Sequence, residues 1–253
     1  MDYSLAYMMT LVMTGFVAGI INILAGGGSH LTLPALMLTG MPADVANATN
    51  RVGVFLHCLV GIGGYNKYDK IHSDDIVPAL IPTLIGGVIG AILASVLPAT
   101  LLKPLLLATM LGVALLILIF PSMIEPPEGT LTYTVNERPL AWLMLFITGI
   151  YGGFVQAGVG FLLITVLAGT LRYDLVRTNA LKLICTCGFT ALALIIFVID
   201  GLVSWIPGLI LAVGSMIGAA VAVKISLNIS QRIMKWFVFL MTLAASATVM
   251  LFH

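Results

Sequence analysis

The sequence predicts an all-α polytopic membrane protein of about eight transmembrane helices, built as two repeated four-helix halves with glycine-broken or re-entrant helices. Of its 253 residues 60% are apolar and only 8% are charged, whereas a soluble domain carries about 25% charge. Long apolar segments recur along the chain, and a glycine cluster interrupts each half. A soluble enzyme is therefore excluded, and the net charge of +1 gives no basic field for nucleic acid.

Eight segments approach the roughly 20 apolar residues that a helix needs to cross a bilayer. In chain order they are residues 3–24, 46–64, 76–97, 101–120, 140–156, 175–199, 202–223 and 233–252. Two other apolar pieces, 31–38 and 161–170, are too short to cross, and each directly follows a glycine cluster. We therefore predict that these two pieces are re-entrant or half-helices.

Landmarks in the two halves recur in the same order, which indicates an internal duplication. The matched pairs are the glycine clusters at 25–28 and 157–160, the dipeptides Thr49-Asn50 and Thr178-Asn179, and the small-residue rows that begin at Gly86 and Gly214. The rows are typical of close helix packing in lipid. We assign residues 1–120 to a first repeat, 121–139 to a linker loop and 140–253 to a second repeat.

Eight crossings would place both termini on one side and give the two repeats the same orientation. Loops on the side of the termini would then hold Lys67, Lys70 and Arg138, and the other side would hold Lys103, Arg172, Arg177, Lys224, Arg232 and Lys235. Because basic residues favour the cytoplasm, the termini are expected to be periplasmic, in a bacterial inner membrane.

The glycine clusters are the first candidates for a binding site. A break inside a membrane helix exposes backbone groups that survive only within protein or beside water, and the positive start of the short helix that follows suits an anion. A tight turn that only helps packing is the alternative. The candidates are Gly26, Gly27 and Gly28 in the first half, Gly158 and Gly160 in the second, and Asn22 and Gln156, which precede the two breaks.

Two cations lie inside predicted spans, where a charge is costly and usually marks a site. Arg51 and Lys182 each follow a glycine break, so we predict that they are counter-charges for an anion; snorkelling to the interface is the alternative. Neighbouring hydrogen-bonding candidates are Thr49, Asn50, Thr178 and Asn179. His30 and His57 could titrate and so couple transport to protons, unless neighbours simply satisfy them.

The remaining charged residues near the spans are given structural roles. Asp44 and Asp174 precede predicted helices and are expected to be N-caps. Asp75 lies in a predicted loop and is expected to be solvated, and Arg177 is expected to snorkel.

The motif around the first break resembles that of the TauE/SafE family of membrane proteins. It reads Gly19-x6-Gly26-Gly27-Gly28-x5-Pro34-x-Leu36-x3-Gly40, followed by Ala46-x-Ala48-Thr49, and 153–160 with Thr178-Asn179 is a degenerate copy. The resemblance implies a transporter, typically an exporter of sulfite or organosulfonates. The chain departs from the family pattern at Ser29-His30 and at Val159, and Arg51 and Lys182 are not part of the motif.

The residues predict an anion transporter that works by alternating access, and the resemblance implies an exporter of a small sulfur-containing anion. A transporter of another small anion or an ion-coupled permease is the alternative. The expected partners are the lipid bilayer and the anion, with proton or ion coupling and homo-oligomerisation left open, and no cofactor, metal or nucleic acid is expected. An intramembrane enzyme is less favoured, because no H-E-x-x-H or G-x-S-x-G pattern occurs. A channel-like subunit suits the duplication less well, and a cation transporter would need mid-span carboxylates that the sequence lacks.

Overall fold

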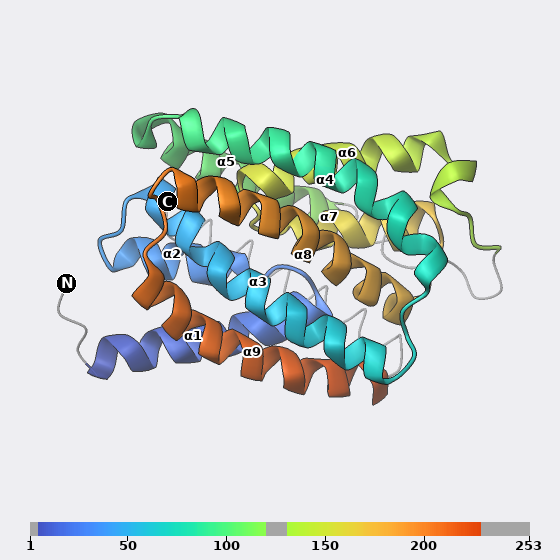
Figure 1. The fold of residues 1–253 in the computed structure, drawn as a ribbon, viewed down its shortest axis with the longest axis horizontal. Coiled ribbons are helices and arrows are strands. Elements are labelled where there is room, and N and C mark those ends of the chain that lie inside the picture. The colour runs from blue at the N-terminus through green and yellow to red at the C-terminus, as the bar shows by residue number, and fades with distance from the viewer. Residues whose placement is uncertain (1–4, 120–130, 229–253) are drawn as a thin grey trace.

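The computed structural model describes residues 5–119 and 131–228, the side chains of 99, 110 and 113–119 excepted, and every regular element in these ranges is helical (Figure 1). The first half contains α1 (Leu5–Leu24), α2 (Ser29–Leu38), α3 (Ala43–Lys67), α4 (Ser73–Val96) and α5 (Ala99–Ile119). After the short helix η2 (Val135–Glu137), the second half contains α6 (Pro139–Phe154), α7 (Val159–Ile164), the π-helical η3 (Thr165–Thr170), α8 (Leu175–Ile199) and α9 (Trp205–Asn228).

Five of the described helices, α1, α3, α4, α8 and α9, are long and apolar enough to cross a membrane. The predicted spans at 101–120 and 140–156 form α5 and α6, whose apolar stretches are shorter within the described residues. The predicted span at 233–252 lies outside the described residues. Both short pieces predicted after the glycine clusters are helical, as α2 and as α7 with η3.

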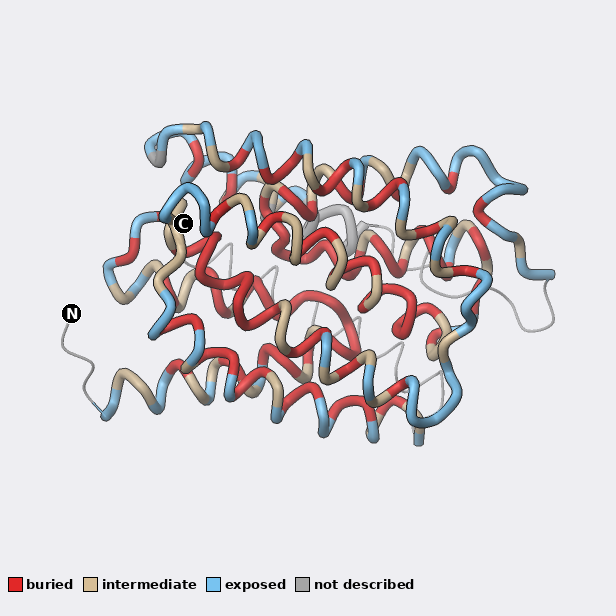
Figure 2. Tube along the Cα trace, viewed as in Figure 1, coloured by how far each residue is buried: buried red, intermediate tan, exposed pale blue. Residues whose placement is uncertain are grey.

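The outer surface of the bundle is apolar along its length. Figure 2 shows α3 and α8 buried over much of their course, whereas α1, α4 and α9 alternate between buried and exposed turns. On α4 the exposed turns carry Ile81, Ile85, Ile89 and Ile92. A surface of this kind faces lipid at low cost, whereas water would disfavour it.

The glycine rows join the two halves by close helix pairs. A Cβ atom added to Gly15 or Gly19 of α1 would overlap the main chain of α9, and one added to Gly149 or Gly153 of α6 would overlap the main chain of α4. Residue numbers rise together along both pairs, so the paired helices are parallel. The first helix of each half therefore packs closely against a helix of the other half: α1 packs against α9, and α6 packs against α4. Small residues allow this close approach.

The first glycine break turns the chain back toward the end of the bundle from which it came. Helices α1 and α9 run in parallel, and α2 leads through residues 39–42 into the start of α3. Thr49 in the second turn of α3 accepts the backbone N–H of Ser204, which directly precedes α9. Helices α1, α3 and α9 thus begin at one end of the bundle, called here the N-terminal end, and α1–α2 is a re-entrant hairpin.

The second break does the same from the opposite end. Helix α6 is parallel to α4, and Arg177 in the first turn of α8 forms an ion pair with Asp75 in the first turn of α4, at 2.6 Å between Nη2 and Oδ2. Helices α4, α6 and α8 therefore begin together, at what is called here the charged end. The hairpin of α6, α7 and η3 enters from the charged end and returns to it.

The helices of the two halves consequently run in opposite directions, which differs from the shared orientation that a count of eight complete crossings would give. That expectation counted the first apolar segment of each half as a complete crossing. Because each glycine break instead returns the chain to its starting end, the hairpin adds no crossing. Each helix of the α6–α9 series then runs opposite to its counterpart in α1–α4.

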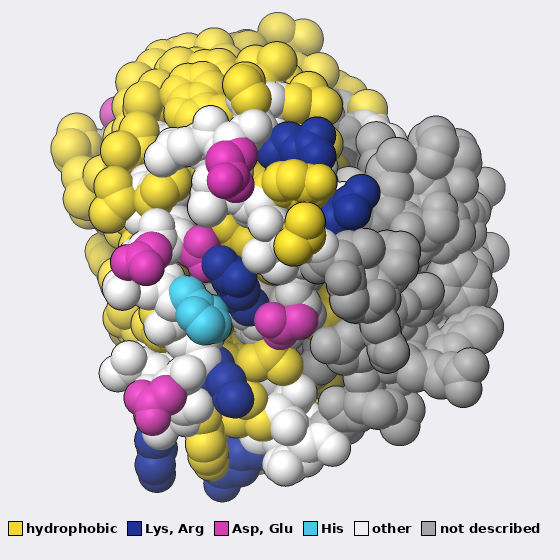
Figure 3. All heavy atoms as spheres, turned by 90° about the vertical axis from the view of Figure 1, so that its right-hand side faces the viewer, with side chains coloured by type: hydrophobic (Ala, Val, Ile, Leu, Met, Phe, Trp, Pro, Cys, Tyr) yellow, Lys and Arg dark blue, Asp and Glu magenta, His cyan; other side chains and the backbone are white. Residues whose placement is uncertain are grey.

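The predicted division of basic loop residues between two sides is also wrong. Tyr65 near the end of α3 is hydrogen-bonded to Ser226 near the end of α9, at 2.7 Å between the two hydroxyl oxygens, and Tyr133 donates its N–H to the carbonyl of Leu171. These contacts place both helix ends and both loops at the charged end, whose face is seen in Figure 3. The described basic residues of that end are Lys67, Lys70, Arg138, Arg172, Arg177 and Lys224.

Candidate functional site

The two glycine breaks touch each other in the middle of the bundle. Gly26 has a φ of +85°, and a Cβ atom on either Gly26 or Gly160 would overlap the main chain of the other. Gly158, with a φ of +74°, adopts the left-handed conformation directly before α7. Gly26 and Gly160 are far apart in the sequence. The fold brings them into contact, because each hairpin reaches the middle of the bundle from its own end.

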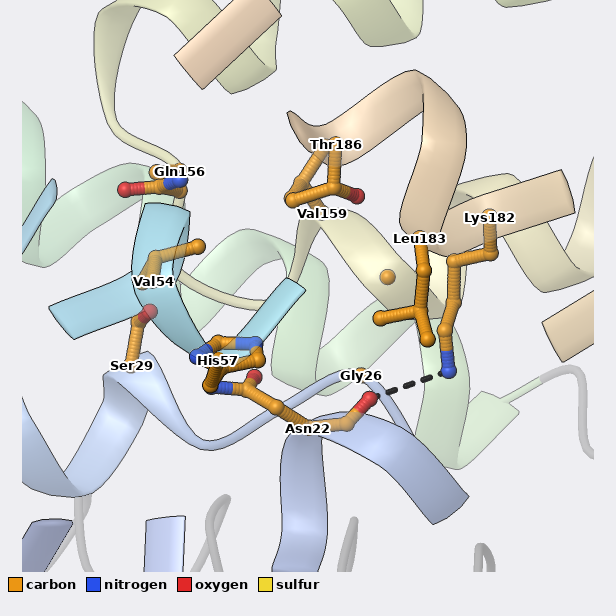
Figure 4. Close-up of a pocket in the computed structure, with 11 residues that line it drawn as sticks. Asn22, Gly26, Ser29, Val54, His57, Gln156, Val159, Lys182, Leu183 and Thr186 are labelled. Atoms are coloured by element: carbon orange, nitrogen blue, oxygen red, sulfur yellow. Dashed lines mark hydrogen bonds between the residues drawn. The ribbon is translucent and has the colours of Figure 1, made fainter. Parts of the chain in front are cut away.

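A small cavity lies beside this contact (Figure 4). Its polar lining residues are Asn22, Ser29, His57, Gln156, Lys182 and Thr186. The cavity has a volume of about 10 Å³, which is room for about one water molecule. Of the predicted site residues, Asn22, Gly26, His57, Gln156, Gly160 and Lys182 line it.

Lys182 is the only Lys, Arg, Asp or Glu among the described residues that line the cavity. Its ammonium group donates to the carbonyl of Asn22 at 3.0 Å, to the carbonyl of Ile23 at 2.9 Å and to Oδ1 of Asn179 at 2.7 Å. The first of these bonds is drawn in Figure 4. Asn22 and Ile23 lie in the last turn of α1, where carbonyls lack helical partners and the helix dipole is negative. Lys182 therefore stabilises the broken end of α1 while it faces the cavity.

Asn22 and Gln156 occupy corresponding places before the two breaks but bond differently. Oδ1 of Asn22 accepts the backbone N–H of Gly28 at 2.8 Å, so Asn22 holds the freed backbone of the first break. Gln156 has a φ of +67°, and its side-chain amide donates to Oγ1 of Thr190 at 2.6 Å. Its Oε1 is buried without a hydrogen-bond partner.

The two candidate histidines also differ in their hydrogen bonds: His57 has partners among the described residues and His30 has none there. Nδ1 of His57 lies 3.1 Å from the carbonyl of Gly53, and since a carbonyl can only accept, Nδ1 carries the proton. Nε2 of His57 is 3.6 Å from Sγ of Cys58, a weak donor. Both ring nitrogens of His30 are buried without partners, and His30 does not line the cavity.

Arg51 is fully buried, as expected of a functional cation, but it lies outside the cavity lining. Its Nη1 donates to the carbonyl of Gly152 at 2.8 Å and its Nη2 to the carbonyl of Gly153 at 2.6 Å. Both carbonyls belong to the last turn of α6. The guanidinium also lies over the ring of Phe197, 5.1 Å from its centroid. These contacts place Arg51 at the joint between α3 and α6, and its contact with an anion stays a prediction.

The other predicted hydrogen-bonding residues support the helices around the cavity. Thr49 accepts from the start of α9, and Thr178 donates to the carbonyl of Tyr173 at 3.3 Å. Asn50 accepts from Thr32 and donates to Oγ of Ser29 at 3.2 Å, so it reaches the cavity through Ser29.

The remaining glycines of the first cluster make room for neighbours. A Cβ atom on Gly27 would overlap the ring of Phe161, and one on Gly28 would overlap the carbonyl of Ala18. The backbone of the first break therefore packs directly against α7 and α1.

Sequence reasoning missed the buried carboxylate at the charged end. Asp75 was expected to be solvated, but its side chain is 6% exposed and bonds both Arg177, expected to snorkel, and the hydroxyl of Tyr173 at 2.9 Å. Burial and the neighbouring Asp75 raise the pKa of Tyr173. The pairing joins residues about a hundred positions apart, so no local pattern announces it.

The two predicted helix caps have different outcomes. Asp174 is the N-cap of α8, as predicted, and accepts from the backbone N–H groups of Val176 and Arg177. Asp44 is not an N-cap, because α3 begins one residue earlier, after Pro42.

The fold and the cavity define a class: a helical membrane protein with two inverted, glycine-broken hairpins that meet at a buried polar cavity, an arrangement typical of secondary transporters. The model of the family described as "Sulfite exporter TauE/SafE" matches residues 11–249. The chain therefore belongs to the TauE/SafE family of membrane transporters.

Relatives of known sequence cover nearly the whole chain. A "Probable membrane transporter protein" of Haemophilus influenzae is 25% identical over 248 residues, 98% of this chain and 96% of that protein. The "Probable membrane transporter protein YfcA" of Escherichia coli is 24% identical over 94% of this chain and 87% of its own length. A "Probable membrane transporter protein ORF9" of a Sinorhizobium species is 24% identical over 240 residues.

Proposed function

We propose that the protein is a transporter, not an enzyme, and that it exports a small sulfur-containing anion, sulfite or an organosulfonate. The observation that carries the proposal is the meeting of the two glycine breaks beside a buried cavity that Lys182 lines. The family description, "Sulfite exporter TauE/SafE", supports the class of substrate. A buried cation without a carboxylate among the described lining residues favours an anion over a cation.

The anion would bind between the two hairpins, against the charge of Lys182. Ser29 can donate its hydroxyl proton to the anion, because Oγ accepts from Asn50, and Thr186 adds a second hydroxyl to the lining. Gly26 and Gly160 would let the ligand approach the backbone closely. The cavity must widen to admit even a small anion, since it now has room for about one water.

The inverted arrangement supports a mechanism of alternating access. One hairpin enters from the N-terminal end, the other enters from the charged end, and their breaks meet between the two. A rocking motion of one half against the other would open the cavity first to one end and then to the other.

The gathered basic residues support an orientation for export. By the positive-inside rule the charged end would face the cytoplasm, so the start of α1 would face the periplasm of a bacterial inner membrane. Protons are candidates for coupling, through His57 in the cavity lining or the unpartnered His30. Homo-oligomerisation is compatible with the apolar outer surface.

Calorimetry on the purified protein in detergent tests the proposal. Sulfite, sulfate, thiosulfate, sulfoacetate and taurine would be titrated into the native chain, into Lys182→Met and into Lys224→Met, a control that removes an exposed lysine of α9. We expect binding of at least one sulfur anion that disappears in Lys182→Met and persists in Lys224→Met. Absence of anion binding in the native chain, or preference for a cation, would refute the proposal. Flux of the bound anion in liposomes of known protein orientation then tests the direction.

A further inference from the structure

The charge of the cavity limits the charge of its ligand. Lys182 supplies one positive charge, and the carbonyls of Asn22 and Ile23 at the negative end of α1 already offset part of it. Arg51 is held by α6 and lies outside the described lining. A ligand with two negative charges would leave at least one of them uncompensated in a buried site, which is energetically unfavourable.

One group of the described lining, the side-chain oxygen of Gln156, lacks a hydrogen-bond donor that the ligand could supply. With its amide nitrogen directed at Thr190, Gln156 leaves Oε1 buried and without a partner. Nε2 of His57 already has the thiol of Cys58 as its hydrogen-bond partner at 3.6 Å, so the acceptor that a donor on the ligand would meet is Oε1 of Gln156. A buried acceptor without a donor is destabilising, so a ligand that brings its own donor to Gln156 binds more tightly.

We propose that the transported species is a singly charged anion that carries a hydrogen-bond donor, as hydrogen sulfite does, and that doubly charged oxyanions are rejected. The inference rests on the proposed function and narrows it. The oxygens of the anion face Lys182, Ser29 and Thr186, and its donor faces Oε1 of Gln156. Sulfate and the fully ionised form of sulfite lack the hydrogen-bond donor and carry two negative charges.

The charge of the ligand can be separated from the titration of the protein. The titratable groups in or next to the cavity from α3 and α8 are His57, Cys58, Lys182 and Cys187, and the described lining from α1, α2, α7 and the two breaks adds none. Sulfite changes from single to double charge near neutral pH, whereas methanesulfonate stays singly charged and sulfate stays doubly charged. Methanesulfonate therefore reports changes in the protein alone.

The experiment is calorimetry of the native protein between pH 6 and pH 8.5 with sulfite, methanesulfonate and sulfate. We expect the apparent affinity for sulfite to fall about tenfold per pH unit once the singly charged form is the minor species. Methanesulfonate should bind more weakly than hydrogen sulfite and equally at every pH, and sulfate should not bind. Sulfate binding as tight as methanesulfonate binding, or a sulfite affinity that does not change with pH, would overturn the inference and leave the proposed function intact.

Two further results would also count against it. If methanesulfonate weakens with pH as sulfite does, the protein's own groups are titrating and the charge of the ligand does not decide binding. If none of the three anions binds at any pH, the proposed function fails together with the inference.

A variant tests the donor separately from the charge. Gln156→Leu removes the buried acceptor and is expected to weaken the binding of sulfite at pH 6 about tenfold, while methanesulfonate changes less than twofold. An equal loss for both ligands would show that Gln156 only shapes the cavity. The melting temperature of the variant shows whether it is folded, and the pH series on the native chain stands independently of it.

Discussion

The two broken helices end in the same way and use their cations differently. The last turn of α1 is held by Lys182 of α8, and the last turn of α6 is held by Arg51 of α3. In both cases the cation comes from the other half and donates to two successive backbone carbonyls. Because the ends of broken helices have carbonyls without partners and a negative dipole, a cation stabilises both places.

The difference lies in what else each cation faces. Arg51 directs its planar fork at the two carbonyls and rests on Phe197, outside the described cavity lining. Lys182 faces the cavity, and a lysine is a point charge on a flexible stem that can exchange a carbonyl for a ligand. Within the described residues Arg51 therefore holds only the end of α6, whereas Lys182 holds the end of α1 and also lines the cavity of the proposed ligand.

The largest expected effect breaks the contact between the two hairpins. Gly26→Ala should lower the free energy of unfolding by about 4 kcal/mol, because it adds left-handed strain to an overlap with the backbone of Gly160. Gly40→Ala is the matched control: its φ is +87° but nothing lies within 4 Å of the added Cβ, so the strain alone, about 1–2 kcal/mol, is expected. Unfolding in detergent measures both, and equal losses would show that the hairpins do not touch.

The next effect compares the two cations directly. Arg51→Met and Lys182→Met should each lower the free energy of unfolding by about 3 kcal/mol, since each leaves two buried carbonyls unpaired. Binding of the sulfur anion should be lost in Lys182→Met and retained in Arg51→Met at a temperature where both are folded. Calorimetry and thermal unfolding on the same samples separate the two properties. Loss of binding in Arg51→Met with normal stability would restore Arg51 as a ligand residue.

A smaller effect compares the joints at the two ends of the bundle. At the charged end Asp75 pairs with Arg177, whereas at the N-terminal end Thr49 only accepts a backbone N–H. Asp75→Asn should lower the free energy of unfolding by about 2 kcal/mol, because it removes a charge-assisted contact of a buried carboxylate. The neighbouring Asp74 is exposed, and Asp74→Asn should change stability by less than about 0.5 kcal/mol. Similar losses in the two variants would mean that the ion pair contributes nothing.

The smallest effect concerns the approach to α6. The backbone N–H of Thr134 donates to the carboxylate of Glu137 at 2.7 Å, which lowers the pKa of that carboxyl. A lowered pKa gives stability that is present above the ordinary carboxyl pKa and is lost as the pH falls through the lowered value. Glu137→Gln should therefore lower the melting temperature slightly at pH 7, and this difference from the native chain should become smaller at acidic pH. Thermal unfolding measures it. A loss that stays constant with pH would exclude the charge as its cause.

The sequence predicted the elements better than their course. The limits predicted for the sixth span, 175–199, coincide with those of α8, and the short pieces after both glycine clusters are helices. The topology was misjudged because hydropathy measures only length and polarity, and the first apolar segment is long enough to cross. Whether a helix continues through the bilayer or turns back at a glycine depends on the helices that it packs against. These are α9 for α1 and α4 for α6.

Taken alone, the sequence determined that this is a helical membrane protein, that glycines break it twice and that Arg51 and Lys182 are buried. Each of these follows from the cost of exposing backbone or charge to hydrocarbon, which is a property of single segments. Only the tertiary structure decided that the halves are inverted, that the breaks touch and that Lys182 alone of the two cations lines the cavity. Those properties depend on contacts between residues more than a hundred positions apart, which no local pattern records.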